Sequence, residues 1–144
     1  RDELGGKFFK DWGKSVTNLR GWSDGDNAFT NYIAHPIQGS ITGRIFIQNS
    51  ERAKKVEFGT SKIYWESRAK AFIFSTIYSF QFEMGPISEA TIGNVGKRQH
   101  NGKSTMAWVD LVITPTVGTI WLITEDIYEK HVLKNWLEKK LTTR

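Results

Sequence analysis

The sequence predicts a mainly α-helical fold, a compact helical domain with proline-kinked helices and a glycine-rich loop. Stretches of more than twenty residues separate its turn signals, and this length favours helices over strands. Small and polar residues recur four apart in these stretches, and steps of four keep side chains on one helical face. The four-residue series are Asn31, His35, Gly39 and Gly43; Ser75, Ser79 and Glu83; and Asp110, Thr114 and Gly118. The small members of each series would let helices approach closely.

The alternative is an antiparallel, barrel-like β fold. Aromatic residues alternate with other residues between Phe72 and Phe82, and side chains two apart line one face of a strand. Such alternation also suits a strand of an outer-membrane barrel. Steps of four preserve one strand face as well, so the spacing leaves both folds open, and segment length favours helices.

Residues 1–26 carry little hydrophobic periodicity, and we expect an extended or loosely helical lead-in there, followed by a single helical domain over 27–144. Asp26 can cap the first helix. That helix would cover the mixed apolar stretch 27–50. Because proline lacks an N–H and disfavours helical backbone at the residue before it, we expect this segment to begin or kink at Pro36.

The remaining helices follow from turn and cap signals. They are expected over 62–82, 105–123 and 125–141. Ser61 can cap the first of them. The glycine-rich stretch 85–103 is the clearest loop and separates the first from the second. Pro115 should kink the second, and the last is amphipathic, with leucine, valine and tryptophan on one side and charged residues on the other.

Composition excludes several classes of function. Basic side chains outnumber acidic ones by 20 to 15, which gives a net charge of +5, and cysteine is absent. Disulfide frameworks and sulfur-based zinc sites are therefore excluded. The basic residues are scattered and accompany no zinc-finger or helix-turn-helix signature, so we expect no nucleic-acid partner. Phosphate-binding and catalytic motifs are also missing, and we expect neither a cofactor nor a metal.

The chain contains six tryptophans, whose apolar body and polar N–H suit membrane interfaces and protein contacts. An aromatic-rich core is the simpler interpretation, and an interfacial belt is the alternative. No stretch reaches about eighteen consecutive apolar residues, the length typical of a transmembrane helix. We therefore expect attachment to a membrane surface rather than a membrane-spanning protein.

Ionisable side chains occur among apolar residues in three of the expected helices. If these helices pack together, His35, Glu83 and Asp110 would converge. A histidine beside carboxylates can act as a general base or help to hold a hard metal ion, so these three are the candidate catalytic residues. The wider polar centre comprises Asn31, His35, Glu66, Glu83, Asp110, Thr114 and Glu125. The simpler interpretation of this centre is a satisfied hydrogen-bonded network that sets helix register.

Four short blocks follow Asp24-Gly25-Asp26 in the chain. They are NYIAHPIQGS at 31–40, YWE at 64–66, FEMGPISE at 82–89 and DLVITPTVG at 110–118. Together they resemble an uncharacterised bacterial domain of predicted cell-envelope proteins, which carries Asn…His-Pro-x-x-Gly, Trp-Glu, Glu…Pro-Ser and Asp-Leu…Thr-Pro-x-x-Gly. Here Ile87 separates Pro86 from Ser88, which departs from the family pattern. The resemblance covers roughly 24–126. It implies export and association with the membrane or the periplasm, and it implies no activity.

We therefore expect a structural or interaction module of a bacterial envelope protein. Its partner would be a membrane surface or another envelope protein, and its location would be periplasmic or membrane-associated. The alternative is a membrane-associated hydrolase or transferase that uses His35 with Glu83 and Asp110. The sequence leaves open whether the protein is an enzyme.

Overall fold

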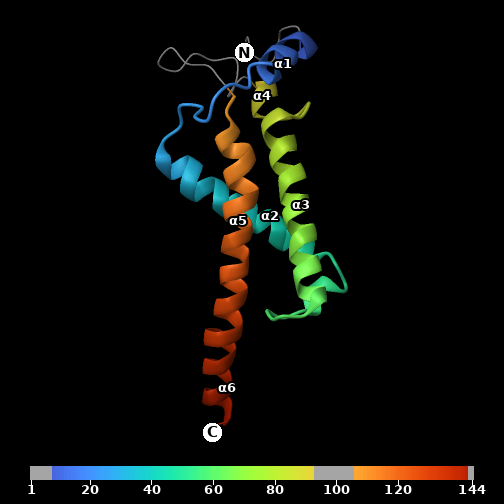
Figure 1. Cartoon of the computed structure of the whole chain (residues 1–144), viewed down its shortest axis with the longest axis vertical. Helices are drawn as coiled ribbons and strands as arrows, with labels where there is room; N and C mark the ends of the chain where they lie inside the picture. Colours follow the sequence, from blue (N-terminus) through green and yellow to red (C-terminus); the bar gives the residue numbers. More distant parts are fainter. Residues whose placement is uncertain (1–7, 93–105, 143–144) are drawn as a thin grey trace.

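The computed structural model describes residues 8–92 and 106–142, in which helices dominate (Figure 1). The helices are α1 (Phe8–Val16), α2 (His35–Gln48), α3 (Lys62–Met84), α4 (Glu89–Ile92), α5 (Trp108–Tyr128) and α6 (Asn135–Thr142). Two π-helical turns, Thr30–Ala34 and Glu129–Lys134, lead into α2 and join α5 to α6, and a 3₁₀ turn covers Ala53–Lys55. Within the described ranges the β pairing is a single isolated bridge between Leu19 and Met106. The prediction of a mainly α-helical fold is confirmed, and the antiparallel β alternative is wrong.

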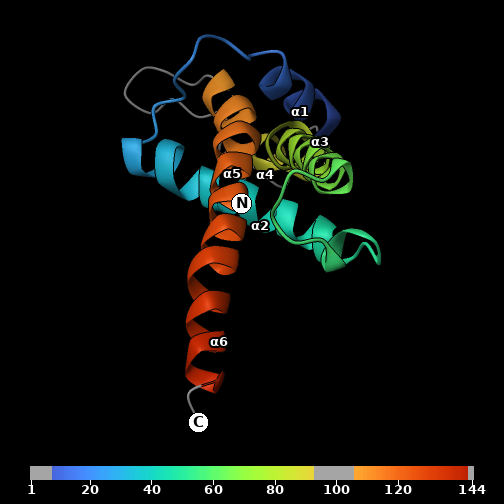
Figure 2. The same ribbon diagram turned by 60° about the horizontal axis from the view of Figure 1, so that its bottom comes forward.

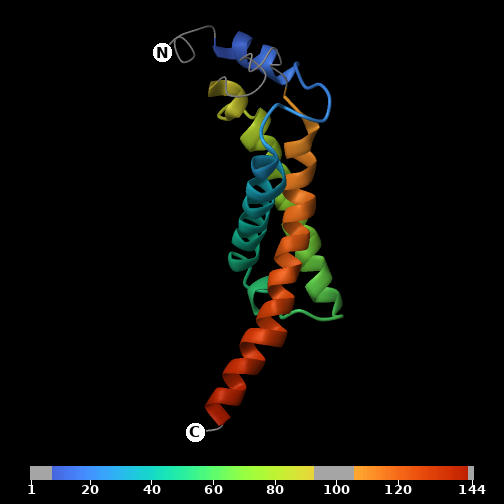
Figure 3. The ribbon, with the colours of Figure 1, turned by 90° about the vertical axis from the view of Figure 1, so that its left-hand side faces the viewer.

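Three long helices form the body of the fold. α3 and α5 run antiparallel beside each other, and α2 crosses them obliquely (Figure 1 and Figure 2). Each of the three contacts the other two. α1 and α4 lie at one end of the body, whereas α6 continues α5 beyond the opposite end (Figure 3). Because α3 runs opposite to α2 and α5, its last turn meets their first turns.

Side-chain caps account for two of the helix starts. Ser61 caps α3 as predicted, because its Oγ accepts a hydrogen bond from the N–H of Tyr64 at 3.2 Å. The helical turns that lead into α2 are capped by Asn27, whose Oδ1 accepts the N–H of Thr30 at 2.9 Å. The prediction of Asp26 as this cap is therefore wrong by one residue. Both residue types are good caps, so propensity alone does not distinguish them.

Part of the lead-in over 1–26, expected to be extended or loosely helical, forms helix α1. Trp12 attaches α1 to the end of α3: its indole Nε1–H donates to the carbonyl of Met84 at 2.9 Å. α1 also contacts α4. A nine-residue helix is marginal by itself in water, so these tertiary contacts explain why this part of the lead-in is helical rather than extended.

Pro36 and Pro115 act differently on the helices that contain them. Pro36 lies in the first turn of α2 and follows a π-helical turn, in which the N–H of His35 bonds to the carbonyl of Thr30. The helix therefore has a wider, π-helical turn just before Pro36, where it was expected to begin or kink. Pro115 lies inside α5, which continues to Tyr128. A proline in a helix leaves one carbonyl without its usual donor, and this does not end α5.

The contact between α2 and α5 depends on two glycines. A Cβ on Gly39 would lie 1.8 Å from the carbonyl oxygen of Thr114, and a Cβ on Gly118 would lie 2.7 Å from the Cα of Gly39. The two backbones therefore touch, as the four-residue series of small residues predicts. Hydroxyl groups join α2 to α3, because Thr42 Oγ1 lies 3.1 Å from Ser75 Oγ.

The interior of the body holds many polar side chains beside a small apolar core that includes Ile47, Ala71 and Leu122, and much of its exterior is apolar. Buried polar and charged side chains of α2, α3 and α5 are Ser40, Thr42, Ser67, Arg68, Ser75, Ser79, Glu83, Asp110, Thr114 and Asp126. Exposed large apolar side chains of the same helices include Ile37, Ile41, Ile45, Phe72, Ile73, Phe74, Ile77, Phe80, Ile120 and Trp121. Water-soluble domains bury most such apolar residues. None of the helices in the described ranges is long and apolar enough to span a membrane.

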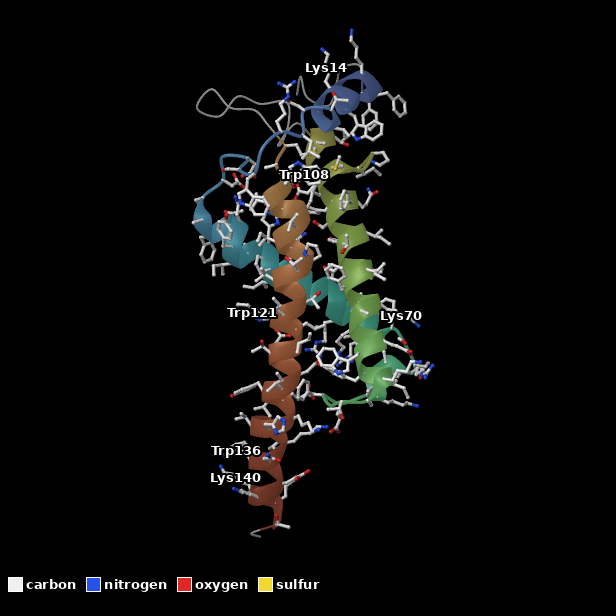
Figure 4. All side chains as sticks on the ribbon, in the orientation of Figure 1. Lys14, Lys70, Trp108, Trp121, Trp136 and Lys140 are labelled. Atoms are coloured by element: carbon white, nitrogen blue, oxygen red, sulfur yellow. The ribbon has the colours of Figure 1, made fainter. Side chains whose placement is uncertain are left out.

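The tryptophans follow the same distribution. Those between 42% and 53% exposed are Trp22, Trp65, Trp108, Trp121 and Trp136. Figure 4 labels the last three of these, which lie at successive positions along α5 and α6. The interpretation of the tryptophans as an aromatic-rich core is therefore wrong.

Candidate functional site

The three candidate catalytic side chains lie together at the end of the body where α1 and α4 also lie. His35 belongs to the first turn of α2, Glu83 to the last turn of α3 and Asp110 to the first turn of α5. One potential ligand atom from each side chain lies within 4.8 Å of the other two. His35 Nε2 is 3.4 Å from Asp110 Oδ1. We call these residues the His35–Glu83–Asp110 cluster.

The bend at Gly21 and Trp22 lies beside the start of α5 and positions Asp110. The first two N–H groups of α5 donate to the carbonyls of Gly21 and Trp22, at 3.2 and 3.1 Å. These bonds supply partners to donors that a helix start leaves free. The carbonyl of Asp110 accepts a hydrogen bond from Ser79 Oγ of α3 at 3.1 Å. Both contacts hold the first turn of α5 against its neighbours.

Asp24, two residues beyond this bend, adds another acidic group to the site. Its Oδ1 accepts hydrogen bonds from Asn31 Nδ2 at 3.1 Å and from the N–H of Asp26 at 2.9 Å. The negative charge of Asp24 lies close enough to Asp110 to raise the pKa of that carboxyl group. Asn31, a member of the predicted polar centre, is buried. Its hydrogen bond orients Asp24 beside the cluster.

A cavity of about 270 Å³ opens beside the cluster. Its ionisable lining residues are Asp24, Asp26, His35, Glu83, Glu89 and Asp110. No described lysine or arginine lines it. Five carboxyl groups thus surround one small space, with His35 as the one basic side chain among the described lining residues, which makes the cavity strongly acidic.

Burial and crowded negative charge shift the pKa values of the cluster. Burial, with the charge of Asp110 as the next cause, raises the pKa of Glu83 to about 8. Burial, followed by the charge of Asp24, raises the pKa of Asp110 to about 7. The pKa of His35 is lowered, because burial outweighs the nearby carboxylates. At neutral pH the cluster therefore combines a neutral imidazole with a protonated carboxyl group.

The free energy of unfolding should decrease as the pH rises from about 4.5 to about 8. The Glu83 carboxyl group loses its proton near pH 4.5 in the unfolded chain and near pH 8 in the folded chain. Below this window the proton is bound in both states, and within it the native state binds more protons, so stability falls as pH rises. Each unit of pKa difference corresponds to about 1.4 kcal/mol.

This pH dependence is measurable by urea unfolding between pH 5 and pH 8, in the presence of a chelator. The charged groups that face Glu83 are Asp24, Asp26, Glu89 and Asp110. Glu83→Gln removes the titrating group and should flatten the pH dependence relative to the original chain. Equal slopes in the two proteins would contradict the pKa shift.

The arrangement supports two kinds of chemistry. A neutral imidazole can accept a proton or bind a metal ion through a ring nitrogen. A buried carboxyl group that stays protonated near neutral pH can donate a proton. Both groups face one cavity, so a small polar molecule or an ion inside it would contact them together.

Other members of the predicted polar centre lie elsewhere. Glu66 is partly exposed and its Oε1 lies 3.6 Å from Nζ of Lys62, one turn earlier. Glu125 lies at the opposite end of the body and accepts a hydrogen bond from Arg44. Thr114 is buried between the two ends, and its Oγ1 has no hydrogen-bond partner. The prediction of a single polar centre is corrected: Glu66 and Glu125 do not reach His35.

A second polar network, absent from the sequence predictions, surrounds Asp126 at the end of α5. Asp126 Oδ2 accepts hydrogen bonds from Arg68 Nε at 2.8 Å and from the hydroxyl of Tyr64 at 3.0 Å. Asp126 Oδ1 accepts one from Arg44 Nη1 at 2.8 Å. Burial and the Asp126 carboxylate raise the pKa of Tyr64 to about 12, so its hydroxyl remains a donor. This network connects α2, α3 and α5 at the end opposite the His35–Glu83–Asp110 cluster.

The spacing of the sequence contains a signal for this network. Continuing the series of Asp110, Thr114 and Gly118 by two more steps of four reaches Asp126. Arg68 precedes Ser75 by seven residues and so lies on the same face of α3 as Glu83. A search extended to arginine and to the full length of each series would therefore have selected Asp126 in place of Glu125.

No family model matches this chain, and neither a curated protein nor a solved structure matches it. The resemblance to the cell-envelope domain therefore stays a prediction from the sequence blocks.

Proposed function

We propose that this chain is a membrane-associated interaction module of the bacterial envelope, which attaches to lipid through the apolar exterior of its helical body. The observation that supports the proposal is that charged side chains are buried in the body while large apolar side chains are exposed on its surface. Arg68, Glu83 and Asp126 are each 4% exposed, whereas Ile77 and Ile120 are each 63% exposed. Extensive apolar surfaces of this kind mark sites of interaction with proteins or membranes. The envelope location rests on the sequence blocks alone.

The apolar belt is defined here as the outer faces of residues 36–43, 71–82 and 111–124. No charged residue occurs in these three stretches. The longer two have 12 and 14 residues, which span about 18 and 21 Å of helix at about 1.5 Å per residue. A bilayer has a hydrocarbon core of about 30 Å. The belt is therefore deeper than one leaflet and shorter than the whole core, which suits partial insertion.

Charge at the ends of the body favours an anionic lipid surface as the partner. Exposed basic residues at one end are Arg52, Lys54 and Lys55, between α2 and α3, and Lys62, the first residue of α3. Lys14 lies at the other end, on α1 (Figure 4). Anionic headgroups attract basic groups that border an inserted apolar surface. The apolar side chains extend over three helices, and a lipid environment can cover such a surface without a specific shape.

Vesicle flotation tests this proposal. The chain should float with vesicles rich in phosphatidylglycerol, and the triple variant Ile73→Ser, Ile77→Ser, Ile120→Ser should lose binding by well over tenfold. The reason is that burial of each isoleucine contributes about 1.5–3 kcal/mol. Added salt should weaken binding in part, because it screens exposed charges beyond about 10 Å at 0.1 M.

The matched control is Ile87→Ser. Ile87 is 87% exposed but lies outside the belt, after α3, so this variant should float like the original chain. Absence of flotation at low salt would overturn the proposal. A soluble oligomer that the triple variant abolishes would indicate that the belt is a protein interface.

A second candidate function is hydrolysis or group transfer at the His35–Glu83–Asp110 cluster. The observation in its favour is that a neutral imidazole and two carboxyl groups from three helices face one cavity. His35→Ala should abolish turnover of generic p-nitrophenyl esters or phosphodiesters, whereas His131→Ala, at an exposed histidine remote in sequence, should not. Equal turnover by both variants would exclude this function for the tested substrates.

A further inference from the structure

One buried acceptor atom in the cavity lacks a partner. Asp110 is 2% exposed, and its Oδ1 makes no hydrogen bond. Nε2 of His35 lies 3.4 Å from this atom. A buried carboxylate oxygen without a donor costs free energy unless another group compensates it. This atom therefore points to a ligand that the protein side chains do not supply.

The surrounding charge indicates the sign of that ligand. The cavity is lined by Asp24, Asp26, Glu83, Glu89 and Asp110, with no described lysine or arginine. The raised pKa values of Glu83 and Asp110 show how costly their negative charges are when protons are the available cations. A bound cation would reduce this cost directly, so the ligand is expected to be positively charged.

The donor atoms select among cations. Magnesium and calcium prefer sites made of oxygen atoms alone, whereas an imidazole nitrogen together with carboxylates suits zinc, manganese and iron. Two ligand atoms at about 2.1 Å from one metal lie about 3.0–3.4 Å apart in octahedral or tetrahedral geometry. The spacing of His35 Nε2 and Asp110 Oδ1 is 3.4 Å, and Glu83 offers an oxygen within 4.8 Å of both.

We propose that this cavity binds a divalent transition-metal ion through His35 Nε2, Asp110 Oδ1 and a carboxylate oxygen of Glu83. Asp24 adds a further negative charge beside Asp110, outside the ligand set. This proposal differs from the sequence prediction, which expects no metal. It does not rest on attachment to lipid, because the cluster lies at the end of the body and the apolar belt lies along its sides.

Manganese binding tests the proposal without any assay of activity or of membrane attachment. After treatment with a chelator, the full chain is titrated with Mn²⁺, and the electron paramagnetic resonance signal of free Mn²⁺ is followed. One ion should bind per chain, and Zn²⁺ should compete for the site. His35→Ala and Asp110→Asn should each weaken binding by at least about tenfold, as the loss of groups in metal sites commonly does.

The matched control is His131→Ala, which removes an exposed histidine from the turn between α5 and α6 and should leave Mn²⁺ binding unchanged. Circular dichroism checks that each variant is folded. If Asp110→Asn does not fold, the original chain is still informative, because electron spin-echo spectra should show coupling of Mn²⁺ to an imidazole nitrogen. Absence of saturable Mn²⁺ binding, absence of nitrogen coupling, or full affinity in His35→Ala would each overturn the proposal.

Discussion

Replacement of Asp126 by alanine should lower the free energy of unfolding by about 3–5 kcal/mol, as removal of one partner of a buried ion pair commonly does. Arg68 is 4% exposed, and its Nε and Nη2 lie 2.8 and 2.7 Å from Asp126 Oδ2. Without Asp126 the guanidinium group would be buried without its counter-charge. The hydroxyl of Tyr64 would lose its acceptor at the same time.

The adjacent residue provides the control for this prediction. Glu125 also bonds to Arg44, but its side chain is 44% exposed, so Glu125→Ala should cost less than about 1 kcal/mol. A double variant, Arg68→Met with Asp126→Leu, should lose less stability than Asp126→Ala, because it leaves no unpaired charge at this pair. Guanidinium unfolding followed by circular dichroism measures all three. Equal losses for the Asp126 and Glu125 single variants would contradict a structural role for the buried pair.

Gly39→Ala should destabilise the fold by about 3 kcal/mol or more, the upper part of the range for overpacked sites. The added Cβ would lie 1.8 Å from the carbonyl oxygen of Thr114. Backbone atoms cannot rotate away from this contact as a flexible side chain does, so α2 and α5 would have to separate. Separation would also disturb the hydrogen bond of 3.2 Å from Ser75 Oγ to the carbonyl of Gly39.

Gly43→Ala is the matched control, one helical turn farther along α2. Its Cβ would lie 3.6 Å from Leu122 Cδ2, an ordinary van der Waals distance. Alanine favours a helix over glycine by about 1 kcal/mol, so this variant should be as stable as the original chain or slightly more stable. Thermal unfolding of both variants separates the effect of contact from the effect of helix propensity. Similar melting temperatures for them would show that the contact between α2 and α5 is not tight.

Much of the helical architecture can be predicted from local signals. Segment length and the cap at Ser61 predict α3, and the series that begins at Asp110 predicts the inner face of α5. The same spacing places His35, Glu83 and Asp110 on faces that can converge. For α1 the sequence leaves an extended and a helical segment open, because the helix is stabilised by contacts such as that of Trp12 with the carbonyl of Met84. The cap at Asn27 was missed because Asp26 has nearly the same capping propensity.

The choice between neighbouring charged residues also needed the structure. Glu125 and Asp126 are adjacent in the sequence and differ by about 100° around a helix of 3.6 residues per turn. Asp126 is buried against Arg68, whereas Glu125 stays at the surface beside Arg44. Glu66 lies two residues before Arg68, on a part of α3 that faces away from this pair, and its ion pair is with Lys62. Which of two neighbouring charged residues is buried depends on how each helix is rotated about its axis when it packs.

By itself the sequence determined the helical class, the boundaries near Ser61 and the sets of residues that share a helix face. The tertiary structure decided which face is inside. Helical periodicity shows which residues share a face, but it does not show whether that face is buried. The same spacing describes an apolar stripe packed in a core and an apolar stripe directed outward. The close contact of Gly39 with Thr114 and the ion pair of Arg68 with Asp126 occupy the interior. These small and paired polar groups share the space between the helices with a small apolar core of Ile47, Ala71 and Leu122, and the large side chains of Ile77 and Ile120 lie on the outside.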